Sequence, residues 1–347
     1  MLTTKAYAAA SATSPLAPLK IQRREPGADD VLIDILYCGV CHTDVSYARG
    51  HFPGPGFPLV PGHEIVGKVV QAGGAVKGYK AGYLVGVGCI VGSCRHCAEC
   101  GSGQEQFCDG LVPTYGGFEA DRKTPTFGGY STQITVDARY VLKIPSGLSP
   151  AAAAPLLCAG ITTYSPLRHW NVGKGSKVAV VGLGGLGHIA VKLAAAMGAE
   201  VTALSRSEGK RADALLLGAA DFVATANPEN LARLRGRFDL ILNTVSAATD
   251  SDLYLSLLGR DGTLVLVGVP DAPLTVNPFG LLMKRKSIAA SIVGGIRETQ
   301  EMLDFCAVHR IASEIEMIDI GQINVAYERI LKSDVRYRFV IDMASLR

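Results

Sequence analysis

The sequence predicts an α/β protein of two domains, a β-rich barrel-like domain followed by a doubly wound parallel sheet. Three observations support this. The 347 residues exceed the usual size of one domain, short β-like runs fill residues 1 to about 150, and strand and helix patterns alternate from Lys177 onward. Apolar residues make up 48% of the chain, which is enough to build sizeable cores.

The first part of the chain carries apolar runs that are separated by glycine and proline clusters. Short runs at short intervals are typical of a barrel-like β domain. The runs are VLIDILYCGV (31–40), EIVGKVVQAG (64–73), YLVGVGC (83–89) and YSTQITVDARYVLKIP (130–145). An Ala-rich segment at 148–167, predicted to be helical, marks the change in character.

The second part alternates between strands and helices, and its apolar strands indicate a parallel sheet. We predict strands at 177–185, 200–207, 238–245 and 262–270, and helices at 187–198 and 209–218. The C-terminal part, 300–347, mixes helix and strand again, and we expect its last strand to return to the first domain.

Net charge and hydropathy exclude several classes of partner. The net charge is +3 with 19% charged residues, so no basic surface for nucleic acid or membrane lipid is predicted. No run approaches about 18 uninterrupted apolar residues, and the N-terminus has no cationic start followed by an apolar core. We therefore expect a cytoplasmic protein without a membrane span.

Four of the nine cysteines lie within fifteen residues, in CRHCAECGSGQEQFC. In a reducing compartment, clustered thiols more often hold a metal than form disulfides. The spacing C-x2-C-x2-C-x7-C of Cys94, Cys97, Cys100 and Cys108 predicts a closed, structural tetrahedral zinc site. An iron–sulfur cluster is the alternative, but the x7 gap and the missing proline disfavour it. His96 is expected to be solvated.

A glycine-rich loop follows the first predicted strand of the second domain and opens a helix. Gly182, Gly184 and Gly187 form G-x-G-x-x-G, the pattern that brings backbone amides against a dinucleotide pyrophosphate. We expect Gly182, Gly184, Gly185, Leu186 and Gly187 to bind the cofactor.

The next strand indicates which dinucleotide is bound. An NAD site normally places an acid about 20 residues after the first glycine, whereas this chain has Ser205 followed by cations. Hydroxyls and cations can hold a 2′-phosphate through charge-assisted hydrogen bonds, so NADP(H) is predicted. The residues expected at the phosphate are Ser205, Arg206, Ser207, Lys210 and Arg211.

A catalytic zinc needs three protein ligands and one open position. Cys41, His63 and Cys158 are candidates, and Glu64 adjoins the histidine. Each of them alone is uninformative, because a lone His or Cys is more often a core residue than a ligand.

Taken together, the motifs GVCHTD, GHEIVG, the four-cysteine loop, LLCAGITTY, GLGGLGH and DVRYRFVID resemble the zinc-dependent medium-chain dehydrogenase/reductase family over residues 5–342. The chain is most similar to its cinnamyl alcohol dehydrogenase branch and to bacterial broad-range NADPH-dependent aldehyde reductases. The resemblance implies a GroES-like catalytic domain (1–158 and 297–347, with the zinc loop 94–108) and a Rossmann NADP-binding domain (159–296), with the active site between them.

The resemblance also implies roles for single residues. Zinc would bind Cys41, His63 and Cys158, and Glu64 would be a carboxylate that can approach the metal. Asp44 would orient His63, Thr43 would bind the substrate oxygen, Thr162 would contact the nicotinamide and Arg336 the pyrophosphate. Cys38, Cys89 and Cys306 match no zinc role and are expected to be buried thiols.

The implied activity is reversible reduction of aldehydes to primary alcohols. A homodimer is expected, because the apolar run SIAASIVGG from Ser287 would be an exposed edge strand. Two departures from the family are Ser46, where its proton relay ends in His, and Tyr83, where it tends to have Asp. The alternatives are a polyol or secondary alcohol dehydrogenase, or a non-catalytic protein that binds NADPH and zinc.

Overall fold

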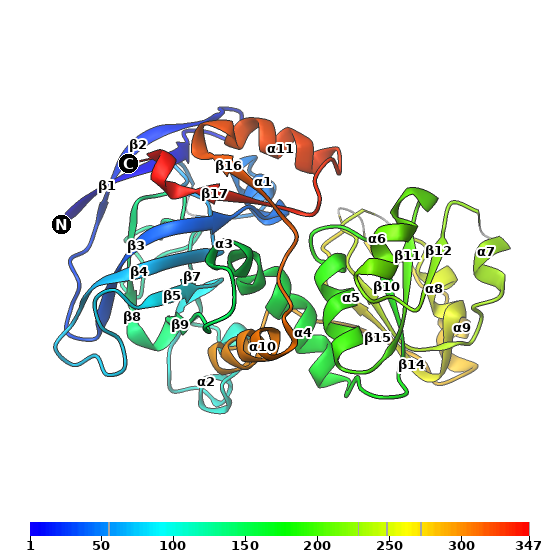
Figure 1. The fold of residues 1–347 in the computed structure, drawn as a ribbon. Coiled ribbons are helices and arrows are strands. Elements are labelled where there is room, and N and C mark those ends of the chain that lie inside the picture. Colours follow the sequence, from blue (N-terminus) through cyan, green and yellow to red (C-terminus); the bar gives the residue numbers. More distant parts are fainter. Residues whose placement is uncertain (55, 228, 248, 271–272, 347) are drawn as a thin grey trace. The chain divides into compact units, whose positions relative to one another are not determined.

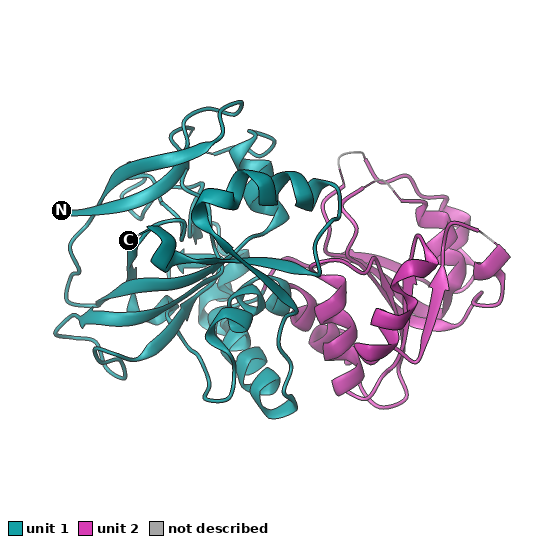
Figure 2. Cartoon of the chain, turned by 45° about the horizontal axis from the view of Figure 1, so that its top comes forward, with its two compact units in different colours: residues 1–161, 294–347 teal, residues 162–293 magenta. Residues whose placement is uncertain are grey.

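The computed structural model describes residues 1–54, 56–227, 229–247, 249–270 and 273–346. The chain divides into two compact units, one of residues 1–161 and 294–347 and the other of residues 162–293 (Figure 2). The sequence predicted domain borders at 158/159 and 296/297. The first lies three residues before the corresponding border between the units, and the second lies three residues after its counterpart.

The first unit is built on a mixed seven-stranded sheet with the order β16-β17-β3-β4-β5-β9, in which β8 also pairs with β3 (Figure 1). Its strands are β3 (Asp30–Gly39), β4 (Ile65–Ala72), β5 (Leu84–Val87), β8 (Gln133–Asp137), β9 (Leu142–Lys143), β16 (Ile315–Asp319) and β17 (Arg338–Asp342). The C-terminal strand β17 pairs antiparallel with β3, with Val340 opposite Gly39, so the last strand does return to the first domain.

Two small two-stranded sheets complete the β structure of this unit. They are β1 (Leu2–Ala9) with β2 (Leu16–Arg23), and β6 (Ile90–Gly92) with β7 (Val112–Pro113). The sequence patterns did not predict β1, β2 or β16. Strand β2, LAPLKIQR, contains a proline and mostly exposed side chains, which are features of an edge strand that weaken an apolar pattern.

The helices of the first unit are short and lie between the strands or after them. They are α1 (His42–Ala48), α2 (Ala98–Ser102), α3 (Pro150–Ala153), the start of α4 (Ala159–His169), α10 (Ile296–His309) and α11 (Ile323–Leu331). The 3-10 turns are η1 (Glu105–Phe107), η2 (Ala138–Tyr140), η3 (Ala154–Leu157), η5 (Ile320–Gln322) and η6 (Met343–Leu346).

The second unit is a six-stranded sheet with the order β12-β11-β10-β13-β14-β15, and all of its strand pairs are parallel. The strands are β10 (Lys177–Val181), β11 (Glu200–Ser205), β12 (Asp221–Ala224), β13 (Phe238–Asn243), β14 (Leu258–Leu266) and β15 (Ser287–Ala290). The remaining helical elements are α5 (Gly187–Ala196), η4 (Glu208–Lys210), α6 (Arg211–Leu216), α7 (Glu229–Ala232), α8 (Ser251–Leu257) and α9 (Pro278–Leu282).

This sheet confirms the predicted doubly wound architecture. Its central strands are almost fully buried because helices connect successive parallel strands, and such strands read as continuous apolar runs. The strand predicted at 262–270 lies at Leu258–Leu266 instead. The prediction started too late because the strand begins in the charged stretch around Arg260 and Asp261, which has no apolar pattern. Within the described part of the chain, none of the helices has the length and apolar character that crossing a membrane requires.

Candidate active site

Four potential metal ligands from three distant segments of the sequence lie together in the first unit. Ligand atoms of Cys41, His63, Glu64 and Cys158 are all within 4.8 Å of one another, and all four residues are buried. Cys41 immediately precedes α1, His63 and Glu64 precede β4, and Cys158 lies between η3 and α4. The three ligands expected from the sequence are thus brought together at the ends of separate elements.

The chemistry of this group fits zinc. His63 Nε2 and Glu64 Oε2 are buried, and neither has a hydrogen-bond partner among the described residues. A buried polar atom without a partner is costly, and a metal ion would satisfy His63 Nε2 as a ligand and offset the charge of the neighbouring Glu64 carboxylate. The sulfur atoms of Cys41 and Cys158 are 3.9 Å apart. The neighbouring Cys158 thiol lowers the pKa of Cys41 well below its usual value, with Arg338 and His63 adding to the effect against that of burial.

Asp44 holds the loops around these ligands together. It is fully buried and accepts hydrogen bonds from the backbone N–H of Cys41 (2.8 Å) and of Gly62 (3.1 Å). The first bond is half of the capping box that starts α1. One carboxylate oxygen also lies 3.5 Å from Nδ1 of His63, which leaves Nε2 for the metal.

Glu64 is paired with a residue that the sequence did not single out. Its Oε1 accepts a hydrogen bond from the guanidinium of Arg338, at the start of β17, and both side chains are buried. Burial raises the pKa of Glu64 to about 7, and Arg338 counteracts this by lowering it. Gly39 makes room for the carboxylate, because a Cβ there would lie 2.0 Å from Glu64 Oε2.

The residues expected to take part in the proton relay lie on α1. Thr43 is half-buried in the first turn, two residues after Cys41, and Ser46 is buried one turn later. The exposed His51 follows the helix, and its backbone N–H binds the carbonyl of Ser46 at 2.9 Å. Ser46 therefore occupies a protected position and not an open surface.

The four-cysteine loop forms a second compact group of possible ligands. The sulfur atoms of Cys94, Cys97, Cys100 and Cys108 lie within 4.8 Å of one another. Backbone N–H groups point at them, from Arg95 to Cys100 at 3.3 Å and from Gly110 to Cys108 at 3.3 Å. All nine cysteines are free thiols, so the loop is shaped for a metal rather than for a disulfide.

His96 and the three cysteines outside the two ligand groups were predicted to be solvated and buried, respectively, and the structure agrees for all but one of them. His96 is exposed as predicted, with Nδ1 2.7 Å from the carbonyl oxygen of Cys94. Cys38 and Cys306 are buried as predicted. Cys89 is only half-buried, so the expectation of a buried thiol was wrong for this residue, and its sulfur lies 3.9 Å from the carbonyl oxygen of Leu157.

The glycine loop of the second unit has the shape that a pyrophosphate requires. Gly182 adopts a left-handed φ of 89°, and a Cβ on Gly187 would lie 1.9 Å from the Gly182 carbonyl oxygen. A Cβ on Gly184 would meet nothing within 4 Å, which leaves that side open to a ligand. Gly185 and Leu186 complete the turn into the ten-residue helix α5.

The predicted phosphate residues follow β11. Ser205 ends the strand, and Arg206 and Ser207 are exposed beyond it. Lys210 donates from Nζ to the carbonyl of Leu183 at 2.7 Å, so it joins this segment to the glycine loop. Arg211 donates a hydrogen bond from Nε to the carboxylate of Glu208 at 2.7 Å. Arg206 is therefore the better candidate of the two for binding a phosphate.

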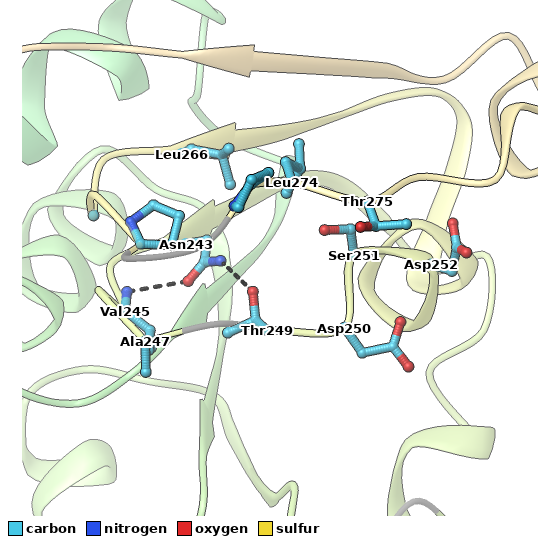
Figure 3. A pocket seen from close by; sticks show the side chains of 13 residues that line it. Asn243, Val245, Ala247, Thr249, Asp250, Ser251, Asp252, Leu266, Leu274 and Thr275 are labelled. Atoms are coloured by element: carbon cyan, nitrogen blue, oxygen red, sulfur yellow. Dashed lines mark hydrogen bonds between the residues drawn. The ribbon is translucent and has the colours of Figure 1, made fainter.

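A cavity of about 380 Å³ lies at the carboxyl ends of β13 and β14, where ligands of open parallel sheets bind (Figure 3). Asn243 is fixed there by hydrogen bonds with the Val245 N–H (3.1 Å) and with Thr249 (3.2 Å). Val245 also adjoins Gly182, since a Cβ on that glycine would lie 2.8 Å from its side chain. The cavity thus borders the glycine loop.

Two expected cofactor residues lie apart from this loop in the sequence. Thr162 is buried within α4. Arg336 belongs to the first unit, where its backbone N–H binds Glu316 at 2.9 Å. Its contact with a pyrophosphate stays a prediction.

Sequence reasoning missed two side chains that shape the metal site, Arg338 and Tyr130, whose hydroxyl donates to Asp44 at 3.2 Å. Tyr115 was expected to line the substrate pocket, but the stacking of its ring on His63 was not expected. Arg338 stands inside the quoted motif DVRYRFVID, so its presence was visible, but its pairing with Glu64 was not.

Comparison with known proteins agrees with this architecture. Residues 27–146 match the family model of the alcohol dehydrogenase GroES-like domain, and residues 185–308 match that of the zinc-binding dehydrogenases. The chain is 57% identical to NADP-dependent alcohol dehydrogenase C 1 of Mycolicibacterium smegmatis, over the whole of both chains. It is 56% identical to the aldehyde reductase YahK of Escherichia coli, over 99% of each.

A solved structure is also similar along its full length. A cinnamyl alcohol dehydrogenase from Helicobacter pylori, in complex with NADP(H), superposes with a TM-score of 0.93 at 42% identity over 99% of each chain. Full-length identities above one half, as with the two curated relatives, show common ancestry. The chain therefore belongs to the zinc-dependent medium-chain alcohol dehydrogenase family, in its cinnamyl alcohol dehydrogenase-like branch.

Proposed function

We propose that this chain reduces aldehydes to primary alcohols with NADPH and catalyses the reverse oxidation. The observation that carries the proposal is the buried group of Cys41, His63 and Cys158, a three-ligand donor set of the kind that leaves one position for substrate. Relatives that match along their full length are an NADP-dependent alcohol dehydrogenase and an aldehyde reductase.

The chain's own groups have separate tasks in this reaction. When bound, NADPH supplies the hydride and zinc polarises the carbonyl oxygen. Thr43, half-buried beside Cys41, donates a proton to the oxygen that becomes the alcohol. Asp44 keeps Nδ1 of His63 protonated and Nε2 directed at the metal. Thr162 and Arg336 are proposed to contact the nicotinamide and the pyrophosphate.

An assay with two substrates tests the proposal. Reduction of benzaldehyde with NADPH by the zinc-loaded protein is the expected result. Faster oxidation of sorbitol would favour a polyol dehydrogenase. Turnover of neither substrate by protein that holds both zinc ions and NADPH would favour a non-catalytic binding protein.

We infer that NADPH is preferred over NADH by at least about a hundredfold in kcat/KM, because each charge-assisted hydrogen bond to the 2′-phosphate contributes roughly 1.5–3 kcal/mol. Ser205, Ser207, Lys210 and the exposed Arg206 are the residues proposed to make these bonds. Ser205→Asp combined with Arg206→Gln should abolish or reverse the preference. Equal use of both cofactors by the parent protein would contradict it.

The proposed metal content is two zinc ions per chain, one held by Cys41, His63 and Cys158 and one by the four-cysteine loop. A four-thiolate site needs reduced cysteines, which favours the cytoplasm as its location. Elemental analysis of active protein should give two zinc ions per chain, and one or none would contradict the assignment.

The proposed assembly is a homodimer that pairs β15 with its copy. Strand β15 is the last strand of the parallel sheet, so one of its edges is unpaired within that sheet. Side chains of the nearby α9 segment are apolar and strongly exposed, with Leu282 at 74% and Phe279 at 64%. A two-fold axis at this edge would cover both features.

A further inference from the structure

Nδ1 of His63 has a weak partner for a metal ligand. The Asp44 oxygen is 3.5 Å away, near the upper limit for a hydrogen bond. The outer torsion of a histidine side chain is broad and roughly two-fold, so a contact this long sets which nitrogen faces the metal but restrains the plane of the imidazole only loosely. A metal ligand must nevertheless be held to within about 10–20°. Some other contact has to fix the plane of this ring.

Tyr115 makes that contact. Its ring lies almost parallel to the imidazole of His63, with centroids 5.5 Å apart and an interplanar angle of 14°. Tyr115 is itself buried, with 3% of its surface exposed. A planar stack resists rotation about the bond between Cβ and the ring, and so adds to the restraint that one long hydrogen bond provides.

Two further aromatic rings hold Tyr115 in turn. Tyr47 meets it edge to face at 5.3 Å and 73°, and Phe52 meets Tyr47 at 5.3 Å and 71°. Gly116 allows this packing, because its φ of 72° suits glycine and a Cβ there would lie 2.8 Å from the Tyr47 ring. Tyr47 stands one helical turn after Thr43 on α1.

We propose that Phe52, Tyr47 and Tyr115 form an aromatic ladder that fixes the imidazole plane of His63, making Tyr115 a positioning residue for the catalytic metal. This inference rests on the proposed metal site. It also predicts that Tyr47, which is not itself a proposed ligand, controls how firmly the metal is held.

The test measures release of zinc from the holoprotein to a chromogenic chelator, together with the visible spectrum after cobalt replaces zinc in the catalytic site. Tyr115→Leu should release the catalytic zinc about 10–100-fold faster, the range usual for groups that orient a metal ligand. Tyr47→Leu should accelerate release about 2–12-fold, the equivalent of one aromatic pair. Both variants should shift the cobalt bands, because these report ligand geometry.

Matched variants separate the ladder from general destabilisation. Tyr115→Phe and Tyr47→Phe keep the rings and should release zinc at close to the parent rate. Tyr254→Leu removes a buried tyrosine of the second unit and should lower the melting temperature without changing zinc release or the cobalt spectrum.

Two results would overturn the ladder. One is a Tyr115→Leu protein that holds zinc as well as the parent does. The other is a Tyr115→Phe protein that loses zinc as fast as the Leu variant, which would assign the effect to the hydroxyl. If Tyr115→Leu fails to fold, Tyr47→Leu carries the test. Because zinc release is measured without substrate, failure of aldehyde reduction in the parent would refute the proposed function and leave this test intact.

Discussion

At the scale of single residues, Glu64 and Arg338 form a buried ion pair beside the proposed zinc ligands Cys41, His63 and Cys158. Both side chains are almost completely buried, and they pair across 274 residues of sequence. A buried ion pair adds little net stability as a whole, but removing one partner leaves an uncompensated charge. The two residues should therefore be strongly coupled.

Arg338→Met should lower the free energy of unfolding by roughly 1.5–3 kcal/mol near pH 7, because Glu64, whose pKa is about 7 even beside the cation, would become protonated and would lose its charge-assisted hydrogen bond. The double variant Glu64→Gln with Arg338→Met should recover a large part of that loss. Urea denaturation of the zinc-loaded proteins, followed by circular dichroism, measures both. A double variant that is as unstable as the sum of the single variants would show that the pair is not coupled.

Also at the residue scale, Thr43 and Ser46 should differ sharply in their effect on turnover. Thr43→Ala should lower kcat by about 10²–10⁴-fold, as expected for a positioned proton donor, and Ser46→Ala by far less. Ser46→His should keep or raise the rate and add an ionisation near pH 6.5, the usual pKa of histidine. The pH–rate profile checks this, and equal losses in the two Ala variants would make Ser46 an essential relay member.

At the scale of elements, the four-cysteine loop also anchors a helix. The carboxylate of Glu105 accepts the N–H of Ile296 at 3.1 Å, and Arg297 donates to the carbonyl of Ser102 at 2.9 Å. A carboxylate at a helix N-terminus satisfies a free backbone N–H and favours the helix dipole. The loop thereby fixes the start of α10, the element with which the chain re-enters the first unit.

The two metal groups should therefore respond differently to chelators. The zinc at Cys41, His63 and Cys158 should leave first, with loss of activity and an unchanged circular dichroism spectrum. Zinc in the closed loop should leave only with loss of folded structure, because its binding is coupled to folding. Timed dialysis with metal analysis checks the order. Loss of the loop zinc before activity declines would contradict it.

At the scale of the whole molecule, the second unit presents an open sheet edge beside exposed apolar side chains. Strand β15 pairs with β14 on one side only. Single exposed apolar residues are normal, but several beside a strand with one open edge favour the dimer proposed above. The expected partner is a second copy of the same chain.

Light scattering at micromolar concentration should give twice the chain mass of 36.4 kDa. Ala289→Pro should shift the protein toward monomer, because proline removes a backbone donor and disrupts strand pairing. Ala8→Pro, in a strand of the first unit, is the matched control for local damage. A parent protein that scatters as a monomer would contradict the dimer.

The sequence by itself determined the features whose residues are close together in the chain. The four cysteines lie within fifteen positions, and the glycine loop is continuous with the strand and helix that flank it. Their geometry follows from local spacing, and the loop sulfurs do converge as the spacing predicted. The alternation of apolar strands and helices likewise specified the parallel sheet, because its central strands are buried on both faces.

Only the tertiary structure decided the contacts between distant residues. The family motifs named Cys41, His63 and Cys158, but no pattern in this chain could pair Arg338 with Glu64 or stack Tyr115 on His63. Spacing-based reasoning also missed β16, which is recognised by its pairing with β17 and not by its half-exposed side chains. The Arg338–Glu64 pair, the Tyr115–His63 stack and strand β16 escaped the sequence for the same physical reason. Long-range pairing depends on which elements the sheet brings together, and that information is spread over the whole chain.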